Sequence, residues 1–313
     1  MKIETSPWES CMRAGDFAGA WRIADRVLQG RAGQSRPDGP RRRRPVWDGS
    51  PLAGRRVLVR CHHEPGDTIQ FIRFVRPLQA IARRVVTCVQ PALIPLLRTM
   101  PGHGRLLPLH DAPDVDYDVD IELMELPHYF RATVETLPGT IPYLLPPRAE
   151  LGRRHPARPA VGLVWHAGDG ETERSIPAPA LAPLTRAGAE LFLLQRGRAL
   201  ADWPFPGAVD AGSDDPLALA STMRALDLVI TVDCFPAHLA GALGVPVWTL
   251  LGHRADWRWM DDRPDSPWYP TMRLFRQHHP GDWTPLIEEV AAGIALRARH
   301  SSTAYATPAF SRR

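Results

Sequence analysis

Asp67 is a carboxylate that we expect at the start of the helix after the first strand, where it would face a ligand cleft. A short apolar run at residues 57–59 is followed by turn-forming residues, and Asp67 then precedes a helix that we expect over residues 68–83. One interpretation is an N-cap, in which Asp67 accepts first-turn amides and Gln70 completes a capping box. The other makes Asp67 a general base that removes a proton from a hydroxyl group. A helix N-terminus weakens such a base, so both interpretations stay open.

A second constellation follows the apolar run at residues 228–232. Asp233 ends this expected strand, Pro236 lies in the first turn of the next expected helix, and His238 lies about one turn in. Unpaired amides at such a helix start favour a diphosphate, and a protonated imidazole would add to the attraction. The alternative is structural, with Asp233 as a cap and His238 satisfied in the core.

A third segment could wrap a phosphate. The loop at residues 165–170 contains Gly168 and Gly170, and it leads to Arg174 and Ser175. Backbone amides and a bidentate guanidinium are suited to phosphate oxygens. Three nearby acids would repel an anion, so Arg174 must outweigh them: Asp169, Glu171 and Glu173.

Aromatic residues gather late in the chain, at residues 256–259 and 266–270, beside arginines at 258, 273 and 276. Such a cluster could stack on a base or on a sugar face. It is equally typical of a loop packed by its own aromatic side chains over a sheet edge.

The metal-binding signals are poor, and we expect no metal ion. The histidine pairs at 62–63 and 278–279 are adjacent, so their side chains diverge in most backbones. Aspartates alternate at positions 114, 116, 118 and 120, and on a strand they would share one face. That pattern favours a solvated face over a cation site.

The elements around these residues form two alternating strand and helix series, at residues 55–145 and 160–297. Such series predict an α/β protein with two parallel sheets and a ligand cleft at the carboxyl ends of the strands. We expect five segments: a tetratricopeptide-like helix pair (1–30), an Arg-, Pro- and Gly-rich linker (31–54), two Rossmann-like domains (55–147 and 158–298) and a disordered tail (299–313).

Composition excludes several classes of protein. The 313 residues are 44% hydrophobic and 23% charged, which is typical of globular domains and not of disordered chains. No run approaches the ~20 apolar residues of a membrane helix, although peripheral membrane contact stays open. The first residues do not resemble a secretory signal, and the four cysteines are widely spaced, so we expect a cytoplasmic protein. Of the 38 basic residues 37 are arginine, a bias that is weak evidence for nucleic-acid binding, which we do not expect.

Several ordered motifs together resemble a known family. The segments at 45–54 and 66–71, the Arg-Ser-Ile-Pro at 174–177, the stretch 227–244 and the aromatic segments at 256–270 are similar to bacterial glycosyltransferases fused to tetratricopeptide repeats. These resemble glycosyltransferase family 9, the ADP-heptose:lipopolysaccharide heptosyltransferases. The resemblance implies the GT-B fold, with two facing Rossmann-like domains, and an inverting, metal-independent transfer that needs no cofactor besides the nucleotide-diphosphate sugar.

Position by position, the resemblance makes Asp67 the base that activates the acceptor. The acceptor would be a glycan, a lipid-linked glycan such as lipopolysaccharide, or a protein. We place the other site residues in two sets. The donor set comprises Arg174, Ser175, Asp233, His238, Gly168 and Gln195, and the acceptor set comprises Gly66, Thr68 and Gln70.

The chain departs from the family pattern in three places, one of which is the loop after Trp165, short and acidic where relatives are often basic and rich in asparagine. Residues 63–65 are His-Glu-Pro where relatives show Gln-Gly-Leu, and residues 234–236 are Cys-Phe-Pro where relatives show Thr-Ala-Val. These departures motivate an alternative hypothesis, a catalytically degenerate GT-B protein that binds or scaffolds a partner.

Overall fold

The computed structural model describes residues 5–31, 46–109, 115–153, 155 and 157–305. The chain divides into two compact units. Unit 1 comprises Met1–Leu145 and the short segment Asp256–Arg263, and unit 2 comprises Pro146–Ala255 and Pro264–Arg313. Unit 1 is therefore completed by residues that lie far along the sequence from the rest of it.

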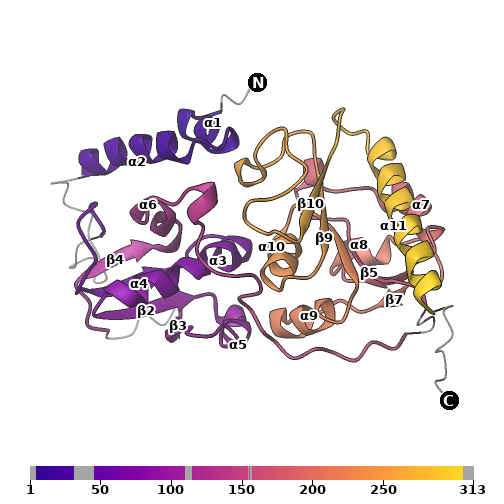
Figure 1. Ribbon diagram of the computed structural model, residues 1–313, viewed down its shortest axis with the longest axis horizontal. Coiled ribbons are helices and arrows are strands. Elements are labelled where there is room, and N and C mark those ends of the chain that lie inside the picture. The colour runs from indigo at the N-terminus through magenta and orange to yellow at the C-terminus, as the bar shows by residue number, and fades with distance from the viewer. Residues whose placement is uncertain (1–4, 32–45, 110–114, 154, 156, 306–313) are drawn as a thin grey trace, which may run out of the picture. The chain divides into compact units, whose positions relative to one another are not determined.

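Unit 1 contains a four-stranded parallel sheet (Figure 1). Its order is β3-β2-β1-β4, with bounds β1 Arg56–Arg60, β2 Arg84–Val89, β3 Arg105–Pro108 and β4 Val119–Glu122. Leu58 of β1 is aligned with Val86 on one side and Asp120 on the other. The valine-rich runs of β1 and β2 are buried, as the predicted parallel sheet requires.

The first helical segment of unit 1 differs from the single helix expected over residues 68–83. It consists of α3 (Pro65–Phe71), a 3-10 turn (Ile72–Phe74) and α4 (Val75–Ile81). The helix begins three residues early because Pro65 occupies a first-turn position, where its fixed φ and missing N–H are favourable. Unit 1 also contains two short helices, α5 (Ile94–Leu97) and α6 (Leu126–Tyr129).

The predicted N-terminal helix pair is present as α1 (Pro7–Arg13) and α2 (Phe17–Arg31). It packs within unit 1, where Trp21 Nε1 donates to the carbonyl of Ala132 at 2.7 Å. Asp25 of α2 binds His128 at 2.8 Å and Arg131 at 2.7 Å. The assignment of the pair to the tetratricopeptide class stays a prediction.

The expected linker over residues 31–54 is only partly a linker. Trp47 and Leu52 are 3% and 0% exposed, and Trp47 N donates to the carbonyl of Asp120 at 2.8 Å. These residues belong to the core of unit 1, because two large apolar side chains gain more from burial than from solvent exposure. The arginine run at 41–44 lies outside the described residues.

Unit 2 contains a six-stranded parallel sheet of order β7-β6-β5-β8-β9-β10. The bounds are β5 Ala160–Val164, β6 Glu190–Leu193, β7 Val209–Asp210, β8 Leu228–Val232, β9 Val247–Leu251 and β10 Met272–Arg276. Numbered from β5, this is the 3-2-1-4-5-6 order of a doubly wound nucleotide-binding fold. The strand order reverses between β5 and β8, and ligands of such sheets bind outside the carboxyl ends of the strands at that point.

Helices lie on both faces of the second sheet, with α9 and α10 on one side and α7 and α11 on the other (Figure 1). Their bounds, with the short α8, are α7 Ala182–Thr185, α8 Arg198–Ala201, α9 Pro216–Met223, α10 Phe235–Ala242 and α11 Thr284–Tyr305. α11 continues past the helix end expected near Arg297, because no glycine or proline interrupts the sequence before Pro308. The rest of the expected tail, residues 306–313, lies outside the described residues.

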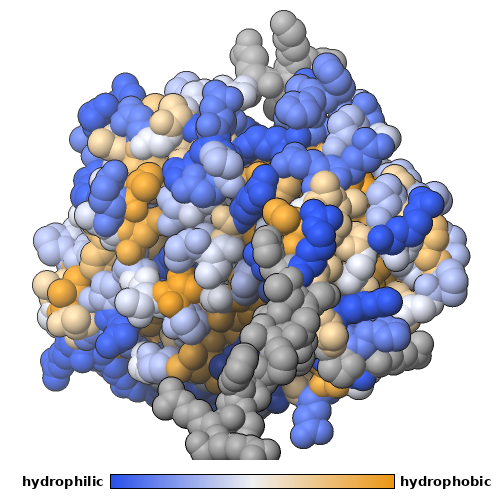
Figure 2. All heavy atoms as spheres, turned by 45° about the vertical axis from the view of Figure 1, so that its right-hand side comes forward, coloured by the Kyte–Doolittle hydropathy of each residue, from blue (hydrophilic) through white to orange (hydrophobic). Residues whose placement is uncertain are grey.

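Among the described helices, none is long and apolar enough to cross a membrane. Hydrophilic and hydrophobic side chains are intermixed on the face drawn in Figure 2. Peripheral membrane contact stays a prediction.

Candidate functional site

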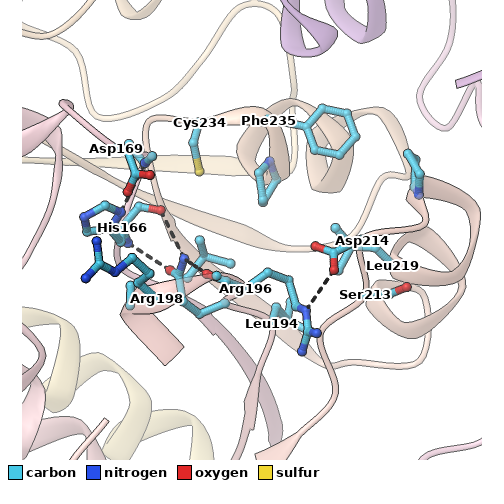
Figure 3. Close-up of a pocket in the computed structure, with 18 of the residues that line it drawn as sticks. His166, Asp169, Leu194, Arg196, Arg198, Ser213, Asp214, Leu219, Cys234 and Phe235 are labelled. Carbon is cyan, nitrogen blue, oxygen red and sulfur yellow. Dashed lines mark hydrogen bonds and ion pairs between the residues drawn. The ribbon is translucent and has the colours of Figure 1, made fainter. Parts of the chain in front are cut away.

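Unit 2 contains a cavity of about 690 Å³ at the carboxyl ends of its central strands (Figure 3). The loops after β5, β6 and β7 line it together with the start of α10, so it lies at the point where the strand order reverses. A volume of this size lies within the ~300–1,000 Å³ range of small-molecule sites. In Figure 3 Cys234 and Phe235 lie across the cavity from Arg196 and Leu194.

The N-terminus of α10 lies at this cavity, which Cys234, Phe235 and Pro236 line. Cys234 is the N-cap residue, its carbonyl accepts from the nitrogen of Ala237 at 2.9 Å, and Pro236 in the first turn has no N–H. Burial raises the pKa of the Cys234 thiol to about 12, so it is neutral at physiological pH and adds no negative charge. The helix start therefore offers a positive potential that suits an anion such as a diphosphate.

The predicted donor residues Gly168 and Gln195 both line the cavity. Gln195 is 6% exposed, and its Oε1 accepts from the backbone nitrogens of Trp165 at 3.1 Å and His166 at 2.9 Å. Its Nε2 donates to the carbonyl of Arg196 at 3.1 Å. Gln195 thus joins the loops after β5 and β6, and Gly168 turns the first of these loops with φ +140°.

Two arginines of the cavity were not predicted. Arg196 is 38% exposed and lies 3.6 Å from Asp210 and 3.7 Å from Asp214. Arg198 is exposed at the start of α8, and no polar partner of its side chain is found among the described residues. The available signal was the Arg-Gly-Arg sequence at 196–198, directly after the buried strand β6.

The predicted phosphate-binding pair is engaged with its own loop. Arg174 binds Glu171 at 2.9 Å, and its Nη1 donates to the carbonyl of Asp233 at 3.3 Å. Ser175 Oγ donates to the carbonyl of Glu171 at 2.7 Å and accepts from the nitrogen of Ala167 at 3.1 Å. Neither residue is among those that line the cavity, and binding of a donor phosphate by Arg174 and Ser175 stays a prediction.

Asp233 and His238 are buried and are not among the residues that line the cavity. Asp233 is 4% exposed, with its Oδ2 3.8 Å from Arg174. His238 is 5% exposed, and its Nδ1 is 3.1 Å from the hydroxyl of Tyr269, which is itself buried. Tyr269 thus contacts the imidazole in the core, and binding of a diphosphate by Asp233 and His238 stays a prediction.

Asp67 is the third helical residue of α3 and not its N-cap. Glu64 precedes the helix, and its backbone nitrogen donates to Asp67 Oδ2 at 3.2 Å. Asp67 Oδ1 accepts from Arg258 Nη2, and the Asp67 side chain is 16% exposed. The capping box predicted from Asp67 to Gln70 is therefore wrong, since the box runs from Glu64 to Asp67.

The three predicted acceptor residues surround Asp67 on α3 and are all buried: Gly66, Thr68 and Gln70. Thr68 Oγ1 donates to Gln90 Oε1 at 2.9 Å, and Gln90 Nε2 donates to the carbonyl of His63 at 2.7 Å. Gln70 Oε1 accepts from Arg258 Nε at 2.9 Å. These contacts position the helix that carries Asp67, and binding of an acceptor by the three residues stays a prediction.

The late aromatic cluster is buried. Trp257 is 9% exposed, Trp259 and Tyr269 are 0% exposed, and Trp268 is 1% exposed. Of the two interpretations left open, the structure supports packing, although the contacts are with other elements: Trp257 meets Trp8 of α1, and Tyr269 meets His238 of α10.

The alternating aspartates form ion pairs with arginines of β1. Asp116 and Asp118 bind Arg56, and Asp120 Oδ2 binds Arg60 Nε at 2.6 Å. These partners were not predicted; the Asp116 side chain is still 58% exposed, and Asp114 lies outside the described residues. Within the described part of the chain no group of three or more His, Cys, Asp or Glu residues is arranged to hold a metal ion.

Comparison with known structures identifies the fold. A family 9 glycosyltransferase from Veillonella parvula is 14% identical, with a TM-score of 0.50 over 82% of this chain and 98% of that one. The E. coli ADP-heptose LPS heptosyltransferase II is 15% identical, with a TM-score of 0.51 over 80% and 99% of the two chains. Both likenesses establish a common fold, so this chain has the GT-B fold that the sequence predicts.

A third structure is the dodecameric iron-containing heptosyltransferase TibC of enterotoxigenic E. coli, in complex with ADP-D-β-D-heptose. It is 13% identical, with a TM-score of 0.51 over 82% of this chain and 79% of that one. No family model matches the sequence. Protein FlbA of Caulobacter vibrioides is 25% identical over 291 residues, which cover 79% of this chain and 48% of that protein. The chain thus spans about half the length of this curated relative.

Proposed function

We propose that the protein is a glycosyltransferase that binds a nucleotide-diphosphate sugar in the cavity of unit 2. The observation that carries the proposal is the cavity itself, which combines the α10 N-terminus with the exposed Arg198 where the strand order reverses. A diphosphate is the anion that such a helix start and guanidinium recognise together. The GT-B fold is consistent with a donor of this class.

Asp67 is the proposed general base of an inverting transfer. The acceptor hydroxyl loses its proton to Asp67, its oxygen forms a bond to the anomeric carbon, and the bond to the diphosphate breaks with its electron pair on the leaving group. Each carboxylate oxygen of Asp67 has one of its lone pairs occupied, by Arg258 or by the Glu64 amide, and retains another for a proton.

We further propose that the transfer is metal-independent. Arg196, Arg198 and the positive end of the α10 helix dipole would stabilise a departing diphosphate. The sugar is a hexose or a heptose in this proposal, and the acceptor is a glycan, a lipopolysaccharide or a protein. The four cysteines are free thiols, which supports a reducing compartment such as the cytoplasm.

A donor panel tests this function. Nucleoside diphosphates and their sugars are screened by thermal shift, because a ligand that binds only the folded state raises the melting temperature. ADP-linked sugars come first, since TibC was crystallised with one. Donors that bind are then assayed for release of the nucleoside diphosphate, with and without acceptor. A protein that no nucleotide sugar stabilises would refute the proposal.

Asp67→Asn tests the base. We expect turnover to fall by roughly 10²-fold or more while the donor dissociation constant is unchanged, because the amide cannot accept the proton. Glu288→Gln removes an exposed acid of α11 and serves as the matched control. Unchanged turnover in Asp67→Asn would remove Asp67 from the mechanism.

The second candidate function is a donor-binding protein without transferase activity. It is favoured by the occupation of both Asp67 oxygens, by Arg258 and by the Glu64 amide. The same panel separates the two functions, since this candidate binds a nucleotide sugar but neither hydrolyses nor transfers it.

A further inference from the structure

The segment Asp256–Arg263, here called the strap, is a part of unit 1 that the sequence supplies from between β9 and β10. It begins with a 3-10 turn over Trp257–Trp259. Asp256 caps this turn, with its Oδ1 accepting from the nitrogen of Arg258 at 2.9 Å. The strap is therefore locally ordered, and Arg258 lies at its centre.

The Arg258 guanidinium donates hydrogen bonds from all three of its nitrogens. Its Nε donates to Gln70 at 2.9 Å, its Nη1 to Asp256 at 2.8 Å and its Nη2 to Asp67. The guanidinium lies 4.6 Å from the centre of the Trp257 ring, and the side chain is only 12% exposed. A planar group with three directed contacts defines the rotamer of the carboxylate that it binds, which a lysine ammonium does not.

Helix α1 holds the strap in turn. The rings of Trp8 and Trp257 meet edge to face with centres 5.0 Å apart. Arg13 Nη1 lies 3.3 Å from Asp261 Oδ1, and the nitrogen of Asp261 donates to the carbonyl of Arg13 at 3.1 Å. A continuous series of contacts thus runs from α1 through the strap to Asp67.

We propose that Arg258 is a positioning residue for Asp67 and that α1 serves the reaction by holding Arg258 in place. This inference rests on the proposed function, because it gives Asp67 the role of the base. Arg258 binds Oδ1 and the Glu64 amide binds Oδ2, so the plane of the carboxylate is fixed before the acceptor arrives. Misplacing a catalytic group by ~1 Å can cost about 10²-fold in rate.

The first test compares Arg258→Met with Arg258→Lys. We expect Arg258→Met to lower kcat by about 10- to 100-fold without changing the donor dissociation constant, and Arg258→Lys to recover part of the loss. The double variant Asp67→Asn/Arg258→Met should be no slower than Asp67→Asn alone, because Arg258 acts through Asp67. Additive losses would show that Arg258 supports the fold alone, and a wild-type or faster Arg258→Met would also overturn the inference.

The second test does not depend on folding of the Arg258 variants. Trp8→Ala and Arg13→Ala each remove one side-chain contact of α1 with the strap, and we expect each to lower kcat several-fold. Arg22→Ala is the matched control, since Arg22 lies on α2 and pairs with Asp16. Losses equal to those of the control would contradict the role of α1. If Asp67→Asn retains full turnover, the proposed base fails instead, and the two failures are distinguishable.

Discussion

Replacement of Arg198 by glutamine should weaken the binding of a nucleoside diphosphate. The side chain is exposed at the cavity, and no polar partner for it is found among the described residues, so its removal disturbs no ion pair that those residues show. A charge-assisted hydrogen bond contributes ~1.5–3 kcal/mol, and solvent screening at an exposed site reduces this to about 1 kcal/mol. One such contact corresponds to a roughly fivefold rise in the dissociation constant.

Isothermal titration calorimetry at low and at high salt measures this change. The difference between wild type and Arg198→Gln should shrink as salt rises, because the Debye length falls from about 10 Å at 0.1 M to ~3 Å at 1 M. Arg186→Gln is the matched control, an exposed arginine at the end of α7 that does not line the cavity. Equal affinities for Arg198→Gln and wild type, or equal losses in both variants, would refute the reasoning.

Two further predictions concern stability. A Cβ at Gly241 would lie 2.4 Å from the buried ring of Tyr269, so Gly241→Ala should lower the free energy of unfolding by about 1–3 kcal/mol in urea denaturation. Gly30→Ala, with no atom within 4 Å, should be neutral or stabilising, and equal effects would contradict the packing. Arg56 lowers the pKa of Asp118 from 3.8 to about 2, so this carboxylate adds stability above pH 3.8 that is lost as pH falls toward 2. Acid titration of Asp118→Asn should show a smaller loss over that interval, and an unchanged profile would contradict the assignment.

Much of the fold follows from local sequence signals. The apolar runs at 57–59, 161–165 and 228–232 are short, rich in valine and bounded by turn residues, and they form the buried strands β1, β5 and β8. Alternation with helices is sufficient to predict two parallel sheets. The start of α3 was missed although Pro65 is a local signal for a first helical turn, whereas the burial of Trp47 depends on contacts made after the chain has folded.

Only those cavity residues that directly follow a buried strand could be predicted from the sequence. Gly168 and Gln195 follow buried strands, and both line the cavity. Arg198 was missed because an exposed arginine after a strand is also typical of an ordinary surface loop. His238 depends on Tyr269, which is 31 residues away, and this separation leaves no local signal of the hydrogen bond.

The residue that binds Asp67 was even harder to predict from the sequence than the partner of His238. Arg258 is 191 residues away in the sequence, and the aromatic residues around it indicate a packed loop as readily as a binding site. Only the fold brings the strap to α3. The sequence therefore locates the carboxylate and does not reveal what holds it.

A crystal structure of the protein grown with a saturating nucleoside diphosphate tests the central claim most directly. The account predicts that the diphosphate lies at the N-terminus of α10, with the Arg198 guanidinium on a phosphate oxygen and Gly168 beside it. A nucleotide bound elsewhere on the chain, or a cavity with no nucleotide at saturating concentration, would contradict it.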